Sequence, residues 1–209
     1  MKVLIACEFS GIVRDSFIAR GHDAWSCDLL PTEKPGPHIQ GDVRRILGRK
    51  WDLMIAHPDC TYITNSGVQW LWNTPKKPKA GILYGPARWK ALDEACAFFK
   101  ELLGAEIPLI AGENPIPHKY AVERIGRTYD QLIQPYQFGH GEMKSTCFWL
   151  KNLPPLMPTR HVAGREQRVF KESPGPNRWK NRARTYQGIA DAMADQWGLV
   201  TWQQALVAA

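Results

Sequence analysis

A thiol and a carboxylate each follow a short apolar segment of this sequence. Cys60 comes shortly after the apolar run 53–56, and Glu113 directly follows the run 107–112. Pro58 and Pro115 end these runs as strands, because proline has no N–H to donate to a sheet. Both runs are predicted to be buried strands of a parallel sheet, whose carboxyl ends bind ligands in α/β proteins. Cys60 and Glu113 are therefore expected to face one cleft.

The chemistry open to Cys60 depends on its surroundings. As a thiolate, a cysteine is a nucleophile that can form a covalent intermediate. As a buried thiol, it is a small hydrophobic side chain, which describes most isolated cysteines. The segment around Cys60 is compatible with both a nucleophile and a buried hydrophobic thiol.

The amino-terminal segment predicts a strand, a tight turn and a helix. The run 3–6 is apolar, residues 8–11 read Glu-Phe-Ser-Gly, and residues 12–20 follow as a helix. Its inner side is expected to carry Ile12, Val13, Phe17 and Ile18. This layout lets the backbone approach a nucleotide-like ligand, although one glycine equally suits an ordinary turn.

Acidic residues follow the early strands. The run 24–27 predicts a second strand that ends at Asp28, which would either hold ribose hydroxyls or cap the next turn. A proline-rich loop at 31–37 leads to the Gly-Asp-Val sequence at 41–43. The order of strands and helices predicts a doubly wound, mostly parallel α/β sheet with a cofactor cleft.

The remaining elements complete one domain over residues 1–209. Helices are expected at 88–103 and 189–197, a helix with a connector at 120–133, and a strand at 146–150. The length suits a single domain with a substantial core. Within it, residues 151–184 form a small, basic, proline-rich excursion.

The charge pattern favours a polyanionic partner. There are 27 Lys and Arg residues against 20 Asp and Glu, a formal net charge of +7. The excursion is either a nucleic-acid-binding segment or a solvated basic surface. Its candidate contacts are Arg165, Arg168, Arg178, Lys180, Arg182 and Arg184. Tryptophans and Lys76, Lys77 and Lys79 after Cys60 also suit base stacking and phosphate contacts, or a plain surface loop.

The cysteines and apolar runs exclude several classes of protein. The five cysteines are scattered and contain no C-x-x-C pair, which argues against a disulfide framework and a structural zinc site. No apolar run approaches 18 residues, and the amino terminus has no signal-peptide pattern. A cytoplasmic protein with no membrane partner is expected.

Taken in order, these motifs resemble the DNA (cytosine-5) methyltransferase family, and small phage-type members above all. Residues 8–11 resemble its Phe-x-Gly cofactor loop, residues 58–60 its Pro-Cys nucleophile motif, and residues 113–115 its Glu-Asn-Val motif. Residues 142–146 lie where the family has Gln-x-Arg-x-Arg, and residues 188–190 lie where it has Gly-Asn. The resemblance covers residues 1–150 and 185–198 and implies the Rossmann-like class I methyltransferase fold.

The resemblance implies transfer of a methyl group from S-adenosylmethionine to C5 of cytosine in DNA, within a phage or its bacterial host cell. Cys60 would be the nucleophile, Glu113 the partner of N3, and Lys144 a contact to O2 or phosphate. The cofactor contacts implied are Phe9, Ser10, Gly11, Asp28, Leu29, Asp42, Val43, Pro58 and Ile189. No metal is implied.

Three departures from the family keep other functions open. Asp59 separates Pro58 from Cys60, and a carboxylate there disfavours the thiolate. Lys144 and Thr146 replace two arginines, and the recognition region shrinks to residues 151–184. The alternatives are the same chemistry on RNA or a free cytosine nucleotide, or a catalytically impaired, cofactor-binding nucleic-acid module.

Overall fold

The structure, a computed structural model, describes residues 1–73 and 81–200. Lys76, Lys77 and Lys79 lie outside these ranges. None of the helices within them is both long and apolar enough to span a membrane.

Seven strands form one sheet in the order β3-β2-β1-β4-β5-β7-β6. The strands are β1 (Lys2–Ala6), β2 (Asp23–Asp28), β3 (His38–Gln40), β4 (Leu53–Ala56), β5 (Leu109–Asn114), β6 (Gln131–Ile133) and β7 (Thr146–Lys151). The first five pair in parallel, whereas β7 runs antiparallel to both β5 and β6. This is the class I methyltransferase fold, so the predicted fold class is confirmed.

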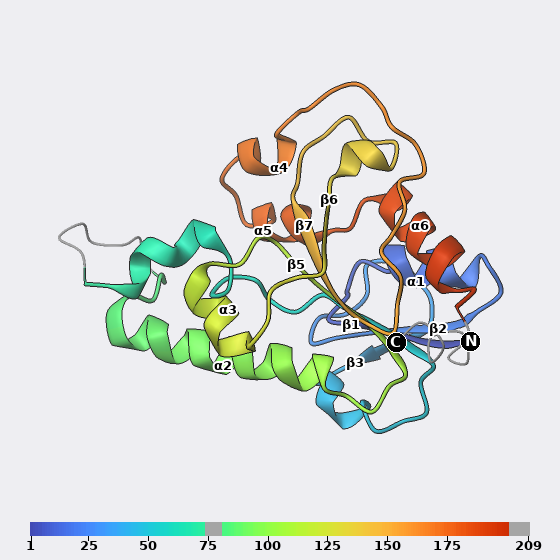
Figure 1. Ribbon diagram of the computed structural model, residues 1–209, viewed down its shortest axis with the longest axis horizontal. Coiled ribbons are helices and arrows are strands. Elements are labelled where there is room, and N and C mark those ends of the chain that lie inside the picture. Colours follow the sequence, from blue (N-terminus) through green and yellow to red (C-terminus); the bar gives the residue numbers. More distant parts are fainter. Residues whose placement is uncertain (74–80, 201–209) are drawn as a thin grey trace.

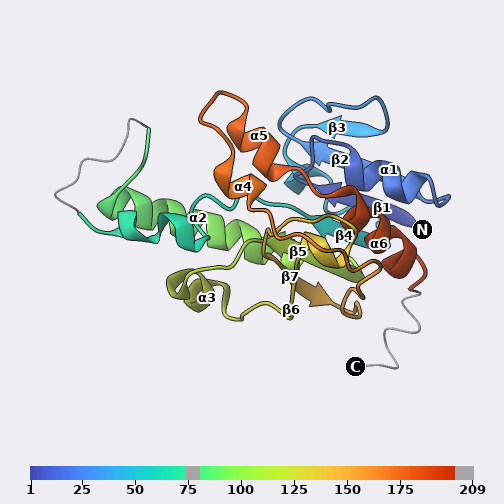
Figure 2. The same ribbon diagram turned by 90° about the horizontal axis from the view of Figure 1, so that it is seen from above.

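Helices cover both faces of the sheet (Figures 1 and 2). They are α1 (Ile12–Ile18), α2 (Gly85–Leu103), α3 (Lys119–Ile125), α4 (Arg168–Lys171), α5 (Arg178–Ala183) and α6 (Gln187–Trp197). Three 3₁₀ helices are η1 (Val43–Arg45), η2 (Asn65–Leu71) and η3 (Pro135–Gln137). Figure 1 shows α1 beside α6, and α2 beside α3 on the other side of the sheet.

The two faces have separate cores because side chains alternate along each strand. Val3 and Ile5 of β1 pack in the core beneath α1 and α6. Leu4 and Ala6 point the other way, into a core that includes Leu102 of α2. The central strands are thus apolar on both faces, as the continuous apolar runs predicted.

The inner side of α1 differs from the prediction. Val13 and Phe17 are buried as expected, but Ile18 is 39% exposed and Arg14 is fully buried. The Arg14 guanidinium donates to Ser26 Oγ at 3.2 Å and to the carbonyl oxygens of Lys34 and Pro35 at 3.1 and 3.3 Å. These bonds replace water around a buried charge and fix the proline-rich loop against α1.

Several predicted elements differ from those in the structure. The strand expected at 107–112 spans Leu109–Asn114: it begins late because Pro108 cannot donate to the sheet, and it includes Glu113. The helix with a connector expected at 120–133 is α3 followed by the strand β6. The strand β3 was not predicted, since three residues give no measurable alternation.

Candidate active site

Cys60 and Glu113 lie at the carboxyl ends of neighbouring parallel strands. Ala56 at the end of β4 pairs with Gly112 of β5, which brings the segments that follow side by side. The Cys60 carbonyl oxygen accepts the N–H groups of Ile63 and Thr64, both at 3.1 Å, so a tight turn holds the half-buried cysteine at this edge. The expected convergence of thiol and carboxylate at one sheet edge is therefore present.

The electrostatic surroundings favour a protonated Cys60. Burial raises the pKa of the thiol to about 11, and the negative charges of Asp59 and Glu113 contribute to the rise. The positive charges of Lys144 and Arg182 act in the opposite direction. Burial and the charges of four neighbouring residues thus act on the Cys60 thiol, and their balance decides how reactive it is.

His57 holds the Glu113 carboxylate. His57 Nδ1 lies 3.1 Å from Glu113 Oε2, and the two side chains are only 9% and 15% exposed. Burial raises the pKa of Glu113, but the hydrogen bond from His57 and the charges of Lys144 and His57 together bring it below its usual value. Glu113 is consequently a carboxylate near neutral pH.

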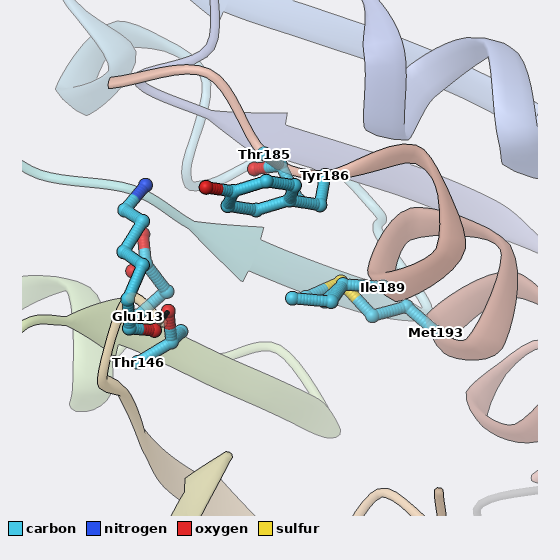
Figure 3. Close-up of a pocket in the computed structure, with 7 residues that line it drawn as sticks. Glu113, Thr146, Thr185, Tyr186, Ile189 and Met193 are labelled. Carbon is cyan, nitrogen blue, oxygen red and sulfur yellow. Dashed lines mark hydrogen bonds between the residues drawn. The ribbon is translucent and has the colours of Figure 1, made fainter. Parts of the chain in front are cut away.

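A pocket lies beside Glu113 (Figure 3). Its cavity volume is only about 10 Å³, and the remainder of the hollow is open to solvent. Its lining residues are Glu113, Lys144, Thr146, Thr185, Tyr186, Ile189 and Met193. Figure 3 shows Glu113 and Thr146 on one side, with the Tyr186 ring above them and Ile189 and Met193 across from them. Carboxylate, hydroxyl and apolar groups therefore surround one small hollow.

Lys144 reaches the pocket from the turn before β7. Its backbone N–H donates to Gln134 Oε1 at 3.0 Å, and its Nζ donates to the Arg184 carbonyl oxygen at 3.4 Å. Two residues earlier, Glu142 Oε2 accepts the Tyr186 hydroxyl at 2.6 Å and Arg168 Nε at 2.9 Å. The Glu142 carboxylate therefore fixes the position of Tyr186, which lines the pocket.

The turn after β1 brings polar groups to the same edge of the sheet. Cys7 has a φ of 59° and Gly11 a φ of 73°, left-handed conformations that turn the chain sharply between β1 and α1. Glu8 Oε1 accepts Ser10 Oγ and the Val13 N–H, both at 2.9 Å. Its Oε2 is buried and has no hydrogen-bond partner in the described part of the chain. A buried carboxylate oxygen of this kind suits a bound cation or donor.

The other predicted cofactor residues occupy two environments. Asp28 ends β2 and Asp42 follows β3, and they accept the N–H groups of Leu30 and Arg44 at 2.9 and 3.0 Å. Leu29 is 73% exposed. Phe9, Ser10, Val43, Pro58 and Ile189 are buried. Acidic acceptors and buried apolar side chains therefore lie at adjacent strand ends.

Most of the residues predicted to bind nucleic acid interact with other groups of the protein. Arg168 pairs with Glu142 at 2.9 Å and Arg184 with Glu33 at 2.7 Å. Arg178 Nε donates to the Glu172 carbonyl oxygen at 2.7 Å, and the Arg165 guanidinium lies 3.5 Å from the centroid of the Tyr136 ring. Lys180 and Arg182 form no ion pair within the described residues.

His57 was missed in the sequence. It follows an apolar strand and precedes Pro58, so neither periodicity nor a motif singles it out. His57 and Glu113 each lie one residue beyond the paired Ala56 and Gly112, and this register brings the two side chains together. That register is visible only in the folded chain.

Solved structures with a similar fold include proteins described as methyltransferases. One is a prophage-encoded protein of E. coli, provisionally assigned as a DNA modification methyltransferase, with a TM-score of 0.45 and 13% sequence identity; the match covers 77% of this chain and 51% of that chain. Another is the Entamoeba histolytica methyltransferase EhMeth, with a TM-score of 0.42 and 15% identity, covering 84% of this chain and 60% of that chain. This chain thus spans less than two thirds of either protein. No family model and no curated protein matches the sequence.

Proposed function

We propose that this chain transfers a methyl group from S-adenosylmethionine to C5 of cytosine in DNA, through a covalent bond between Cys60 Sγ and C6 of the base. The observation that carries this proposal is the convergence of Cys60 and Glu113 at the ends of β4 and β5. Lys144 lies close enough to influence the pKa of both groups, and it lines the pocket with Glu113.

These residue types match the demands of the reaction. C5 of cytosine is a poor nucleophile, and addition of the Cys60 thiolate at C6 makes C5 reactive. The Glu113 carboxyl is assigned to N3, where it offsets the charge that develops in the ring. Lys144 is assigned to O2 or a phosphate. After transfer, a base or water removes the C5 proton, the C6–S bond breaks, and Cys60 leaves.

The protonation states define what substrate binding must accomplish. Cys60 must lose its proton before it attacks, and Lys144 and Arg182 supply the positive charge that favours the thiolate. Glu113 must carry a proton to donate at N3, whereas the isolated protein holds it as a carboxylate against His57. Entry of cytosine beside Glu113 would supply the partner that favours its protonated form.

The cofactor is assigned to the edge formed by the loop after β1 and the ends of β2 and β3. Asp28 and Asp42 would accept hydroxyl groups there, and Glu8 Oε2 would accept from a cationic amine. S-adenosylmethionine, when bound, supplies the electrophilic methyl group. In duplex DNA the target cytosine would have to leave the base stack to reach Glu113.

Covalent trapping tests the proposal directly. The protein is incubated with S-adenosylmethionine and DNA containing 5-fluorocytosine, then denatured and its intact mass measured. Fluorine at C5 blocks the final elimination, so the expected product is a methylated adduct that maps to Cys60. Cys60→Ala should form none, and Cys96→Ala, which alters a buried thiol of α2, should form the adduct as the wild type does.

The high pKa of Cys60 favours one alternative, a catalytically impaired module that binds cofactor and nucleic acid. Binding of cofactor without any adduct on DNA would support this alternative. Adducts on single-stranded RNA or on 5-fluorocytidine nucleotides, but not on DNA, would instead establish the same chemistry on another substrate.

A further inference from the structure

The helix α5 belongs to the basic excursion, yet it packs against the loop assigned to the cofactor. The centroids of the Trp179 and Phe9 rings are 5.9 Å apart, with the planes tilted by 56°. Lys180 Nζ lies 5.9 Å from the Phe9 centroid and 5.6 Å from the Trp179 centroid. Phe9 is only 7% exposed in this arrangement, whereas Trp179 is 52% exposed.

A second contact fixes the same segment to the neighbouring proline-rich loop after β2. The Arg184 guanidinium forms two bonds with the Glu33 carboxylate, at 2.9 and 2.7 Å. The Glu33 N–H in turn donates to the Phe9 carbonyl oxygen at 2.8 Å. Trp179 in α5 and Arg184 just after it therefore contact two loops that are bonded to each other, which places the Trp179 ring beside Phe9.

Apart from the contact between Trp179 and Phe9, the attachment of α5 is polar and shallow. Neither α4 nor α5 buries a side chain among the described residues. Asn181 donates to Glu172 Oε1 at 2.7 Å, and Arg178 bonds the Glu172 carbonyl oxygen. Segments held by a few surface bonds open at low cost, so α5 can adjust while the sheet stays fixed.

We propose that Trp179 is the outer aromatic wall of the cofactor site, against which the purine ring of S-adenosylmethionine stacks. This inference rests on the proposed function, because it takes the Phe9 loop as the cofactor loop. A flat heteroaromatic ring that approaches Phe9 must meet Trp179, which already covers it. Stacking on a large aromatic face is the interaction that purines share with such sites.

Calorimetric titration tests this role without any methyl transfer. The probes are S-adenosylhomocysteine and adenosine, titrated into wild type, Trp179→Ala and Trp179→Phe. Loss of a base–aromatic stack should weaken both probes in Trp179→Ala by about 5- to 100-fold. Trp179→Phe keeps a ring and should bind each probe within about 3-fold of wild type.

Phe170→Ala is the matched control. Phe170 lies in α4 of the same excursion, is 76% exposed and should leave the affinity for both probes unchanged. Wild-type affinity in Trp179→Ala would overturn the assignment of Trp179 alone, and so would a loss confined to S-adenosylhomocysteine. Absence of binding to wild type would remove the proposed cofactor, and this inference with it.

Discussion

Cys60 lies among opposing charges that set its reactivity. Asp59 and Glu113 stabilise its protonated form, and Lys144 and Arg182 stabilise its thiolate. Asp59 is exposed, and its Oδ1 accepts the N–H and the hydroxyl of Thr61 at 2.9 and 2.6 Å. Its charge is therefore the one that substitution can remove with least disturbance to the turn.

Asp59→Asn should speed alkylation of Cys60. Asparagine keeps an acceptor for Thr61 but removes a negative charge, so the pKa of Cys60 falls. We expect iodoacetamide to modify Cys60 about 2- to 5-fold faster at pH 8, as followed by peptide mass spectrometry. Asp23→Asn, at the amino end of β2, is the control and should leave the rate unchanged. Equal rates in Asp59→Asn and wild type would mean that Asp59 does not restrain the thiol.

The pair of His57 and Glu113 should contribute to stability in a pH-dependent way. The pKa of Glu113 is lower in the folded protein than its ordinary value of 4.5. Its stabilisation is therefore complete above that ordinary value, and it is lost as the pH falls through the folded value.

Glu113→Gln should lower the free energy of unfolding by about 1–2 kcal/mol at pH 7, and this deficit should shrink below about pH 4.5. Urea unfolding at several pH values measures the difference from wild type. Glu106→Gln, at an exposed position, should show little effect at any pH. A deficit that stays constant with pH would show that ionised Glu113 is not the source of the stabilisation.

Among the elements, α5 and the residue after it attach the basic excursion to the loops after β1 and β2. The bond between Arg184 and Glu33 joins residues 151 positions apart in the sequence. Both side chains are partly exposed, at 35% and 29%, so the pair is worth at most about 1 kcal/mol.

Glu33→Gln should make α5 more accessible to trypsin. Removal of the ion pair raises the population of the open segment, and we expect cleavage within 171–182 to accelerate by up to about 5-fold. Mass spectrometry of limited digests identifies the cut sites. Asp195→Asn, on α6, breaks an ion pair with Arg20 and should leave cleavage in α5 unchanged. Unaltered cleavage in Glu33→Gln would show that other contacts hold α5.

The main elements followed from local sequence, and the contacts between distant segments did not. Apolar runs predicted β1, β2, β4, β5 and β7, because strands covered on both faces need such runs. Because Pro58 and Pro115 end two of these runs, the sequence also predicted that Cys60 and Glu113 lie at the carboxyl edge of the sheet. The bond from His57 and the pairing of Arg184 depend on strand register and on loops far apart in sequence. The residues alone specify neither.

For the whole molecule, the formal charge of +7 suggests more positive charge for binding nucleic acid than the paired arginines leave available. Arginines already paired with carboxylates release few counterions when a phosphate approaches. Arg182 differs, since its Nε is buried and has no hydrogen-bond partner within residues 1–73 and 81–200.

Arg182→Ala should reduce the salt dependence of DNA binding more than Arg165→Ala does. Loss of one phosphate contact lowers the slope of log K against log[salt] by about 1. Arg165 already bonds the carbonyl oxygen of Val162 and covers the Tyr136 ring, so its loss should change the slope little. Fluorescence anisotropy over a range of NaCl concentrations measures both slopes. A larger change in Arg165→Ala would reverse the assignment.

The two outermost strands of the sheet, β3 and β6, have three residues each. A strand at the border of a sheet offers unpaired N–H and C=O groups, which other chains can extend into fibrils. Three residues present too short a template for such growth. The protein should therefore withstand concentration without forming aggregates that bind thioflavin T, even though its central strands are almost entirely apolar.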